Sequence, residues 1–219
     1  MLNNPSKNNQ QYYFKTAFAL SVFTIVYNIA EGAISTYLGY NDESLALFGF
    51  GADSFIETVS GFGILHMVIR IKRDPESNRD KYERTALKIT GFAFYALVLT
   101  LIVTSIYNIV TNQQPETTLW GVIISCISIL VMLLLVQQKT KVGKALNSPA
   151  IIADAECTKV CIYMSVVLLI SSGLYQFAKT LYIDSIGAII LAYLSFKEGR
   201  ECFEKAESDK HCSCESDCH

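Results

Sequence analysis

The sequence predicts an all-α, polytopic membrane protein built as a bundle of six transmembrane helices. Hydrophobic residues make up 51% of the chain and charged residues only 17%, whereas a soluble domain carries about a quarter charged residues. Two runs, Ile89–Gln114 and Thr117–Gln138, contain no Asp, Glu, Lys or Arg, and each can cross a hydrocarbon core of about 30 Å. Strands are not expected, because a lipid-exposed sheet must close into a barrel of alternating polarity and these runs are apolar all round.

Polar breaks divide the apolar sequence into its spans. The predicted spans are 13–39, 44–70, 86–111, 117–138, 149–177 and 181–199. Asn41–Glu43 follows the first span, the charged stretch Arg70–Arg84 follows the second, and Pro115 lies in the third break. Pro149 begins the fifth span, at the helical position where proline is tolerated. The chain is thus divided into an N-terminal segment (1–12), a transmembrane domain (13–205) and a tail (206–219).

The basic residues indicate the orientation in the membrane. Of the 18 Lys and Arg residues, 16 lie near the two termini or in the second and fourth connections, and Lys139 is assigned to the fourth connection. Connections rich in Lys and Arg stay in the cytoplasm, so we expect a multi-pass protein of the cell (inner) membrane with both termini cytoplasmic. A net charge of −2 without a basic, aromatic-rich patch argues against nucleic acid as a partner.

Ionisable side chains inside the spans indicate where function lies, because a charge in the membrane centre costs about 2.5–3.5 kcal/mol or more. They are Glu31, Asp53, Glu57, Asp154, Glu156, Lys159 and Asp184. Asp53 and Glu57 are four residues apart, so both carboxyl groups lie on one face of span 2. Two carboxylates this close repel unless one keeps its proton or both share a cation. The pair therefore predicts a metal or proton site; the alternative is a protonated or hydrogen-bonded structural pair.

Span 5 carries a matching pair, Cys157 and Cys161, again four residues apart, with Asp154 about one turn earlier. If spans 2 and 5 face each other, two oxygens and two sulfurs converge as a tetrahedral site suited to zinc or cadmium. The alternative is that both thiols only pack in the interior, as single buried cysteines do. Glu156 and Lys159 lie on the other side of span 5 and are expected to form a structural ion pair.

Four stretches of the chain carry a resemblance to a known family: Asn28–Gly32, Ser44–Gly61, Ala153–Ser165 and Ile183–Ala188. Over roughly residues 14–205 the chain resembles the cation diffusion facilitator (cation efflux) family. The family's D-x-x-x-D motif in span 2 reads D-x-x-x-E here, and its H-x-x-x-D in span 5 reads C-x-x-x-C. The Glu-Gly-Arg-Glu ending at 198–201 resembles a short bacterial subgroup that lacks the family's C-terminal cytoplasmic domain.

The resemblance implies a transporter rather than an enzyme, with a divalent metal cation as substrate and no cofactor. The expected mechanism is efflux by proton-coupled alternating access in a homodimer, with Asp53, Glu57, Cys157 and Cys161 as metal ligands. Cysteine in place of His and Asp moves the preference toward softer ions, from zinc to cadmium. Asp154 and Glu31 are candidates for holding these ligands or relaying protons, and a structural role is the alternative.

The tail contains five further potential ligands: His211, Cys212, Cys214, Cys218 and His219. They suggest capture of metal from the cytoplasm, where thiols stay reduced; the alternative is a weakly binding tail. Two other functions remain open: a membrane-bound metal sensor or scaffold that does not transport, and a redox-active thiol pair. The second matches poorly, because redox motifs have two intervening residues rather than three.

Overall fold

The computed structural model describes residues 7–41, 45–73, 79–111, 119–178 and 183–207. The regular structure of these residues is helical throughout, which confirms the predicted fold class. The helices are α1 (Lys7–Asn41), α2 (Leu45–Arg73), α3 (Arg79–Thr111), α4 (Leu119–Leu146), α5 (Pro149–Ala178) and α6 (Ile183–Glu207). They follow the predicted spans in order, but α4 continues eight residues beyond the predicted limit of 138.

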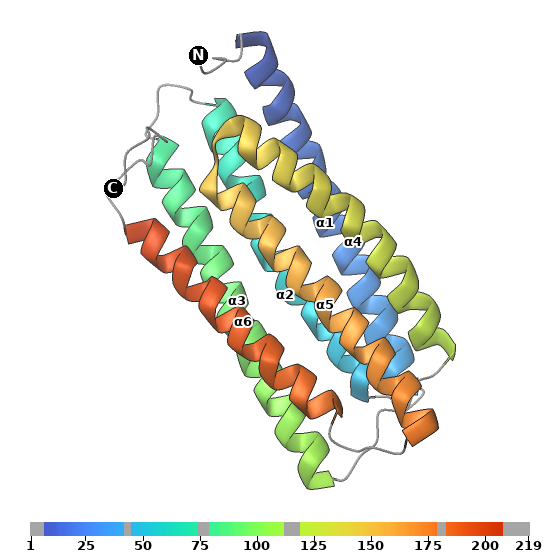
Figure 1. The fold of residues 1–219 in the computed structure, drawn as a ribbon. Helices are drawn as coiled ribbons and strands as arrows, with labels where there is room; N and C mark the ends of the chain where they lie inside the picture. Colours follow the sequence, from blue (N-terminus) through green and yellow to red (C-terminus); the bar gives the residue numbers. More distant parts are fainter. Residues whose placement is uncertain (1–6, 42–44, 74–78, 112–118, 179–182, 208–219) are drawn as a thin grey trace.

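The helices alternate in direction, so the start of α1 and the end of α6 lie at the same end of the bundle (Figure 1). Helices α2 and α5 are central: α2 packs against α1, α3 and α5, and α5 packs against α2, α3, α4 and α6. Helices α1 and α4 lie on one side of this central pair, and α3 and α6 lie together on the other (Figure 1). The two helices that carry the predicted ligands are therefore neighbours inside the bundle.

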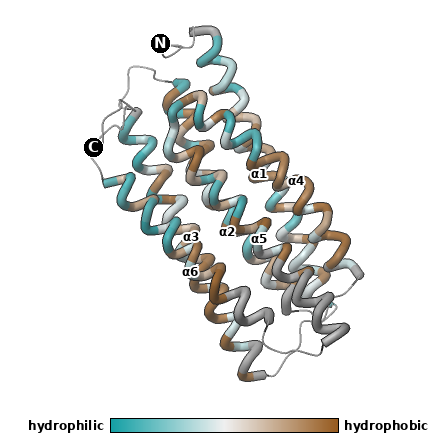
Figure 2. The backbone as a smooth tube through the Cα atoms, viewed as in Figure 1, coloured by the Kyte–Doolittle hydropathy of each residue, from teal (hydrophilic) through white to brown (hydrophobic). Residues whose placement is uncertain are grey.

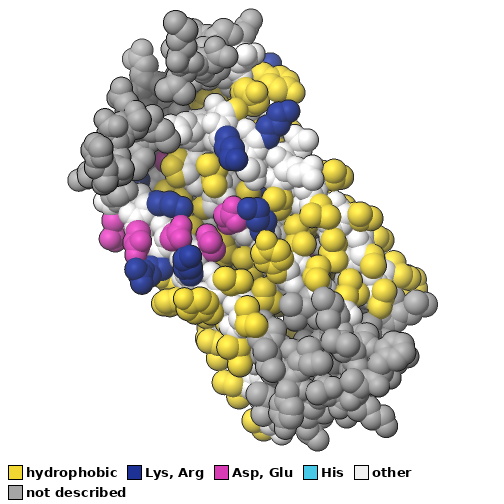
Figure 3. All heavy atoms as spheres, in the orientation of Figure 1, with side chains coloured by type: hydrophobic (Ala, Val, Ile, Leu, Met, Phe, Trp, Pro, Cys, Tyr) yellow, Lys and Arg dark blue, Asp and Glu magenta, His cyan; other side chains and the backbone are white. Residues whose placement is uncertain are grey.

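The outer surface is that of a membrane protein. Helices α1 to α4 each contain a stretch that is long and apolar enough to cross a membrane: Asn9–Asn41, Leu47–Arg73, Asp80–Tyr107 and Val122–Leu146. Hydrophilic residues gather toward the end where α1 begins and α6 ends, and hydrophobic residues dominate α4 and α6 further from it (Figure 2). On the face seen in Figure 3, the charged side chains of the described residues gather toward that same end, and hydrophobic side chains predominate among the described residues further from it. An apolar surface of this extent fits lipid rather than water.

Close contact between α1 and α2 depends on glycine. A Cβ atom at Gly51 would lie 2.8 Å from the backbone nitrogen of Thr36 and 2.9 Å from the carbonyl oxygen of Gly32. Neither backbone atom can move aside, so any larger residue would separate the two helices. Small residues at such crossings are common between membrane helices because they allow the backbones to approach. This contact fixes the position of α2, and with it Asp53 and Glu57, against α1.

The interior combines an apolar core with a polar centre. The apolar core includes Met67, Val68, Phe94, Leu97 and Val142, all nearly inaccessible to solvent. The polar centre consists of buried side chains from five helices: Thr24, Asn28, Glu31, Asp53, Ser54, Glu57, Ser60, Thr90, Lys139, Asp154 and Thr158. Buried polar groups are costly unless they find partners, so their contacts indicate which of them hold the fold together and which are available to a ligand.

Candidate metal site

The connection between α4 and α5 sets the register of these two helices. Asn147 follows the last residue of α4 with a positive φ of 49°, a conformation that asparagine tolerates better than most residues. The backbone N–H of Asn147 donates to the carbonyl of Lys144 at 3.2 Å, and that of Ser148 donates to the carbonyl of Gly143 at 2.9 Å. This is the Schellman arrangement that ends a helix, and it turns the chain directly into α5.

The start of α5 is capped by Ser148 and by a carboxylate from α3. The Ser148 hydroxyl accepts a hydrogen bond from the backbone N–H of Ile151 at 3.4 Å and donates to Glu83 Oε2 at 2.8 Å. Glu83 also accepts from the backbone N–H of Ala150 at 3.3 Å. A hydroxyl cap and a nearby negative charge both stabilise a helix N-terminus. The capped turn thus fixes where the first turns of α5 lie against α4 and α3.

This register brings Lys139 of α4 into the polar centre, which the sequence analysis did not predict. The side chain of Lys139 is only 2% exposed, and its Nζ lies 2.8 Å from Asp154 Oδ2 and 3.7 Å from Glu57 Oε1. Nζ also donates a hydrogen bond to Thr158 Oγ1 at 2.9 Å. The assignment of Lys139 to a cytoplasmic connection is therefore wrong. Because α4 runs on to Leu146, Lys139 lies about two turns inside the helix.

Asp154 has partners on both carboxylate oxygens. Lys139 binds Oδ2, and the Ser60 hydroxyl of α2 donates to Oδ1 at 2.7 Å. Ser60 is in turn hydrogen-bonded to the Thr90 hydroxyl of α3 at 3.0 Å. Asp154 thus joins four helices through a buried network, the kind of fully partnered polar cluster that rigidifies a core.

Glu57 and Asp53 are partnered only in part. Glu57 is fully buried, and its Oε1 accepts a short hydrogen bond from the Thr158 hydroxyl. Its other oxygen, Oε2, and Asp53 Oδ1 are buried without a hydrogen-bond partner among the described residues. A buried acceptor left without a partner costs about 1–3 kcal/mol, and more if it is charged. Two such oxygens one turn apart on α2 are the arrangement that a bound cation would relieve.

Cys157 and Cys161 lie one turn apart on α5, and Cys161 packs against Met132 of α4. Both thiols are free and buried. The Cys161 thiol lies beside the Cys157 thiol, and it is near enough to Glu57 and Asp53 to interact with their charges. Spans 2 and 5 do face each other, because Ser60 of α2 donates to Asp154 of α5 and Thr158 of α5 donates to Glu57 of α2. Among the described residues, no three His, Cys, Asp or Glu side chains lie close enough together to hold a metal ion. The four-ligand site therefore stays a prediction.

On α1, Glu31 forms a second buried acidic position next to this site. Its carboxylate accepts hydrogen bonds from Tyr27 at 3.0 Å and from Ser54 of α2 at 2.9 Å. One turn earlier on the same helix, Asn28 is fully buried, and neither atom of its amide has a hydrogen-bond partner within the described part of the chain. The role of Glu31 in holding ligands or relaying protons stays a prediction.

Lys139, Thr158 and Ser60 were not predicted from the sequence as parts of the site. A signal for Lys139 was present, because the first strong helix-ending sequence after Leu119 is Asn147–Pro149. No comparable signal exists for the two hydroxyls, because Ser and Thr are common in membrane helices.

The remaining predictions differ in outcome. The ion pair between Glu156 and Lys159 is confirmed, with 2.6 Å between Oε1 and Nζ. The side chain of Asp184 lies outside those that the structure describes, and so do the ligands predicted in the tail, all of which fall in 208–219.

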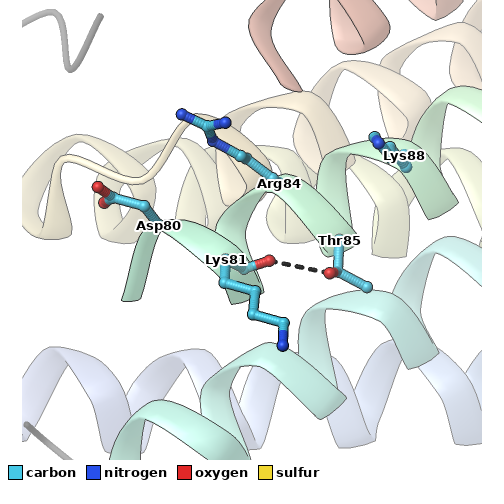
Figure 4. Close-up of a pocket in the computed structure, with 5 residues that line it drawn as sticks. All are labelled: Asp80, Lys81, Arg84, Thr85 and Lys88. Atoms are coloured by element: carbon cyan, nitrogen blue, oxygen red, sulfur yellow. Dashed lines mark hydrogen bonds between the residues drawn. The ribbon is translucent and has the colours of Figure 1, made fainter. Parts of the chain in front are cut away.

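A surface pocket of about 430 Å³ on α3 is separate from these residues. It is lined by Asp80, Lys81, Arg84, Thr85 and Lys88, and the Thr85 hydroxyl donates to the carbonyl of Lys81 at 2.8 Å (Figure 4). Three cationic side chains against one carboxylate repel a metal cation. We therefore place the candidate metal site between α2 and α5 rather than in this pocket.

Comparisons with known proteins agree with this architecture. The family model described as the cation efflux transmembrane domain matches residues 17–209. An uncharacterized transporter, MJ0449, of Methanocaldococcus jannaschii is 29% identical over 180 residues, which cover 80% of this chain and 63% of that protein. The manganese efflux system protein MneP of Bacillus subtilis is 24% identical over 194 residues, which cover 83% of this chain and 64% of that protein.

The chain therefore spans less than two thirds of the length of either relative. The family match, by contrast, extends from within α1 to beyond the end of α6. It includes most of α1, the whole of α2 to α6 and every residue of the candidate site. This protein belongs to the cation efflux family of membrane proteins.

Proposed function

We propose that the protein transports a divalent metal cation through the centre of the bundle, with Asp53 and Glu57 of α2 and Cys157 and Cys161 of α5 as its ligands. The observation that carries this proposal is the pair of buried oxygens, Asp53 Oδ1 and Glu57 Oε2, which lack partners among the described residues. The nearby helix α5 contributes the thiols of Cys157 and Cys161, which are buried as well. A cation held between α2 and α5 would satisfy both oxygens and convert the thiols into thiolate ligands.

The ligand chemistry favours zinc or cadmium as the substrate. Thiolates bind soft or borderline ions more strongly than hard ones, and two thiolates with two carboxylates suit tetrahedral coordination. Manganese is the second candidate, because one relative is named as a manganese efflux protein. Manganese prefers oxygen ligands, so it would depend on Asp53 and Glu57 and little on the cysteines.

The proposed mechanism is proton-coupled alternating access in the direction of efflux. Metal loading on thiols and carboxylates releases protons, and protons returning to the same groups help to expel the ion. Glu31 and Asp154 hold the ligands in place or relay these protons. Both termini lie in the cytoplasm, two copies form the working dimer in the cell (inner) membrane, and His211 to His219 capture metal near the entrance. The common end of the bundle shared by the start of α1 and the end of α6 is consistent with this orientation (Figure 1).

Flux of Zn²⁺, Cd²⁺ and Mn²⁺ into proteoliposomes with an imposed pH gradient tests the proposal. Asp53→Asn and Glu57→Gln keep the shape of each side chain and remove its charge, so each should reduce flux by about a hundredfold or more. Glu156→Gln is the matched control: it removes an acidic group from the outer side of α5 and should leave flux unchanged. Metal binding without flux in the parent protein would favour the alternative of a sensor or scaffold.

The cysteines are tested separately. Cys157→Ser with Cys161→Ser should strongly reduce Cd²⁺ flux, while Cys126→Ser, at an exposed position on α4, should have no effect. Cys157→His with Cys161→Asp should shift the preference from Cd²⁺ toward Zn²⁺, because imidazole and carboxylate are harder ligands than thiolate. If the double serine variant transports like the parent, the thiols only pack and the ligand set on α5 must be revised.

A further inference from the structure

We propose that Lys139 is an internal cation that competes with the transported metal for Glu57, and that Asp154 determines how strongly it competes. This inference rests on the proposed metal site and adds a residue that sets its affinity. In this role Lys139 is not a ligand but a positioning residue, because it acts on the metal through Glu57.

The geometry places Lys139 between two carboxylates and closer to one of them. Its Nζ contacts Asp154 Oδ2 at 2.8 Å, while Glu57 Oε1 is 3.7 Å away. Thr158 connects the two, since its hydroxyl accepts from Lys139 and donates to Glu57 Oε1. Glu57 is therefore held by one oxygen, and its other oxygen, Oε2, has no partner among the described residues. The Glu57 carboxylate can thus interact with two cations, the ammonium of Lys139 and an arriving metal ion.

The balance of charge makes this competition unavoidable. Among the described residues, Glu31, Asp53, Glu57 and Asp154 are buried in the polar centre, and Lys139 is the one buried Lys or Arg. A divalent ion bound at Glu57 would repel an ammonium within a few ångströms, because charges interact strongly in a low dielectric. The ammonium can respond by moving fully to Asp154, which Ser60 holds in place through Oδ1. No proton transfer is needed for this movement.

Two sets of substitutions in the Lys139–Asp154 pair should therefore change the affinity for the metal in opposite directions. Asp154→Asn removes the stronger partner, so the ammonium would turn to Glu57 and weaken metal binding. Lys139→Met combined with Asp154→Asn removes the competing cation together with its partner, so the metal would bind more tightly and leave more slowly. The double variant also leaves no unpaired charge at Asp154, which makes it better tolerated than Lys139→Met alone.

The experiment is calorimetric titration of the full-length protein in detergent with CdCl₂, and again with MnCl₂. The relevant signal is the component that Glu57→Gln abolishes, which separates this site from the Cys- and His-rich tail. We expect on the order of tenfold weaker binding in Asp154→Asn and on the order of tenfold tighter binding in the double variant, because close charges in a protein interior are strongly coupled. Lys141→Met is the matched control, on the same helix but exposed, and should bind like the parent.

Flux measurements on the same variants provide an independent readout. The double variant should show a lower KM together with a lower maximal rate, since the metal enters readily but is released slowly. If the ion pair is purely structural, Asp154→Asn and the double variant should both weaken metal binding, or both leave it unaltered. Either result would overturn the role of Lys139.

The outcome also distinguishes this inference from the proposed function. If binding in the parent depends on Glu57 but is insensitive to Lys139 and Asp154, only the competition is wrong. If binding and flux in the parent do not depend on Asp53 and Glu57 at all, the proposed metal site itself is wrong, and the inference fails with it.

Discussion

Among the described residues, two lysine–carboxylate pairs involve α5, and they differ in how they are made. The pair between Glu156 and Lys159 joins residues three apart on one helix, with side chains about a third exposed. The pair between Asp154 and Lys139 joins α5 to α4, and both side chains are almost completely buried. The distances are similar, 2.6 and 2.8 Å. Local spacing alone makes the first pair, whereas the second requires two helices in a particular register.

The surroundings give the two pairs different energies. A partly exposed pair contributes about 0–1 kcal/mol, because solvent already stabilises each charge. A buried pair contributes little by forming, but breaking it leaves one charge without a partner in a low dielectric and costs about 3–5 kcal/mol. The buried pair therefore ties the stability of the bundle to the arrangement of its polar centre.

The largest expected effect comes from breaking the buried pair. Lys139→Met should lower the free energy of unfolding by about 3–5 kcal/mol, because Asp154 and Glu57 lose their common cation. Lys159→Met should lower it by less than about 1 kcal/mol. Thermal unfolding of both variants in the same detergent measures the difference. Equal losses of stability in the two variants would show that burial does not make the pair of Lys139 matter more for stability than the pair of Lys159.

A smaller effect is expected from disturbing the contact between α4 and α5 near their connection. A Cβ at Gly143 would lie 2.9 Å from Ile152 Cγ1 and 3.3 Å from the backbone nitrogen of Ile152. Gly143→Ala should therefore be less stable than the parent by about 1–3 kcal/mol, the usual cost of overpacking. Gly49→Ala is the control, because a Cβ there meets nothing within 4 Å. Unfolding midpoints that change equally in both variants would contradict the importance of this contact.

The cap of α5 should matter somewhat less. Ser148→Ala removes the hydroxyl that caps the helix and donates to Glu83, and should cost about 1 kcal/mol. Thr16→Ala removes an exposed hydroxyl that bonds within α1 and should change stability by less than about 0.5 kcal/mol. Hydrogen exchange across 139–158 would show whether the cap holds the register of α4 and α5. Unchanged protection of this region would show that packing alone holds it.

The smallest effect is expected from reversing the exposed pair. Glu156→Lys with Lys159→Glu keeps both charges on one helix and should change stability by less than about 0.5 kcal/mol. The corresponding reversal of the buried pair, Lys139→Asp with Asp154→Lys, should be strongly destabilising. The carboxylate at position 139 would then face the carboxylate of Glu57. If both reversals leave the free energy of unfolding nearly unchanged, the charge at position 139 does not affect Glu57.

Much of the fold could be predicted because its causes are local in the sequence. Charge-free apolar runs can be stable in lipid only as helices, so their number and order follow from composition. A spacing of four residues places Asp53 with Glu57, and Cys157 with Cys161, on single helical faces whatever the rest of the chain does. The spacing of Glu156 and Lys159 made their ion pair predictable for the same reason.

The position of Lys139 could not be predicted in this way, because only the tertiary structure decides it. Whether a lysine near the end of an apolar run faces the cytoplasm or the interior depends on where its helix ends and which helix it meets. Here the helix ends two turns later, at a turn made by Asn147, and the capped start of α5 brings Asp154 and Thr158 to the same level.

The same division applies to the candidate site as a whole. The sequence by itself determined which residues can act as ligands, because helical periodicity is a property of each segment. The tertiary structure decided that Glu57 Oε1 is held by Thr158 near Lys139, while Glu57 Oε2 and Asp53 Oδ1 find no partner among the described residues. The physical reason is that hydrogen bonds and ion pairs act over about 3 Å, and only the packing of helices determines which groups come that close.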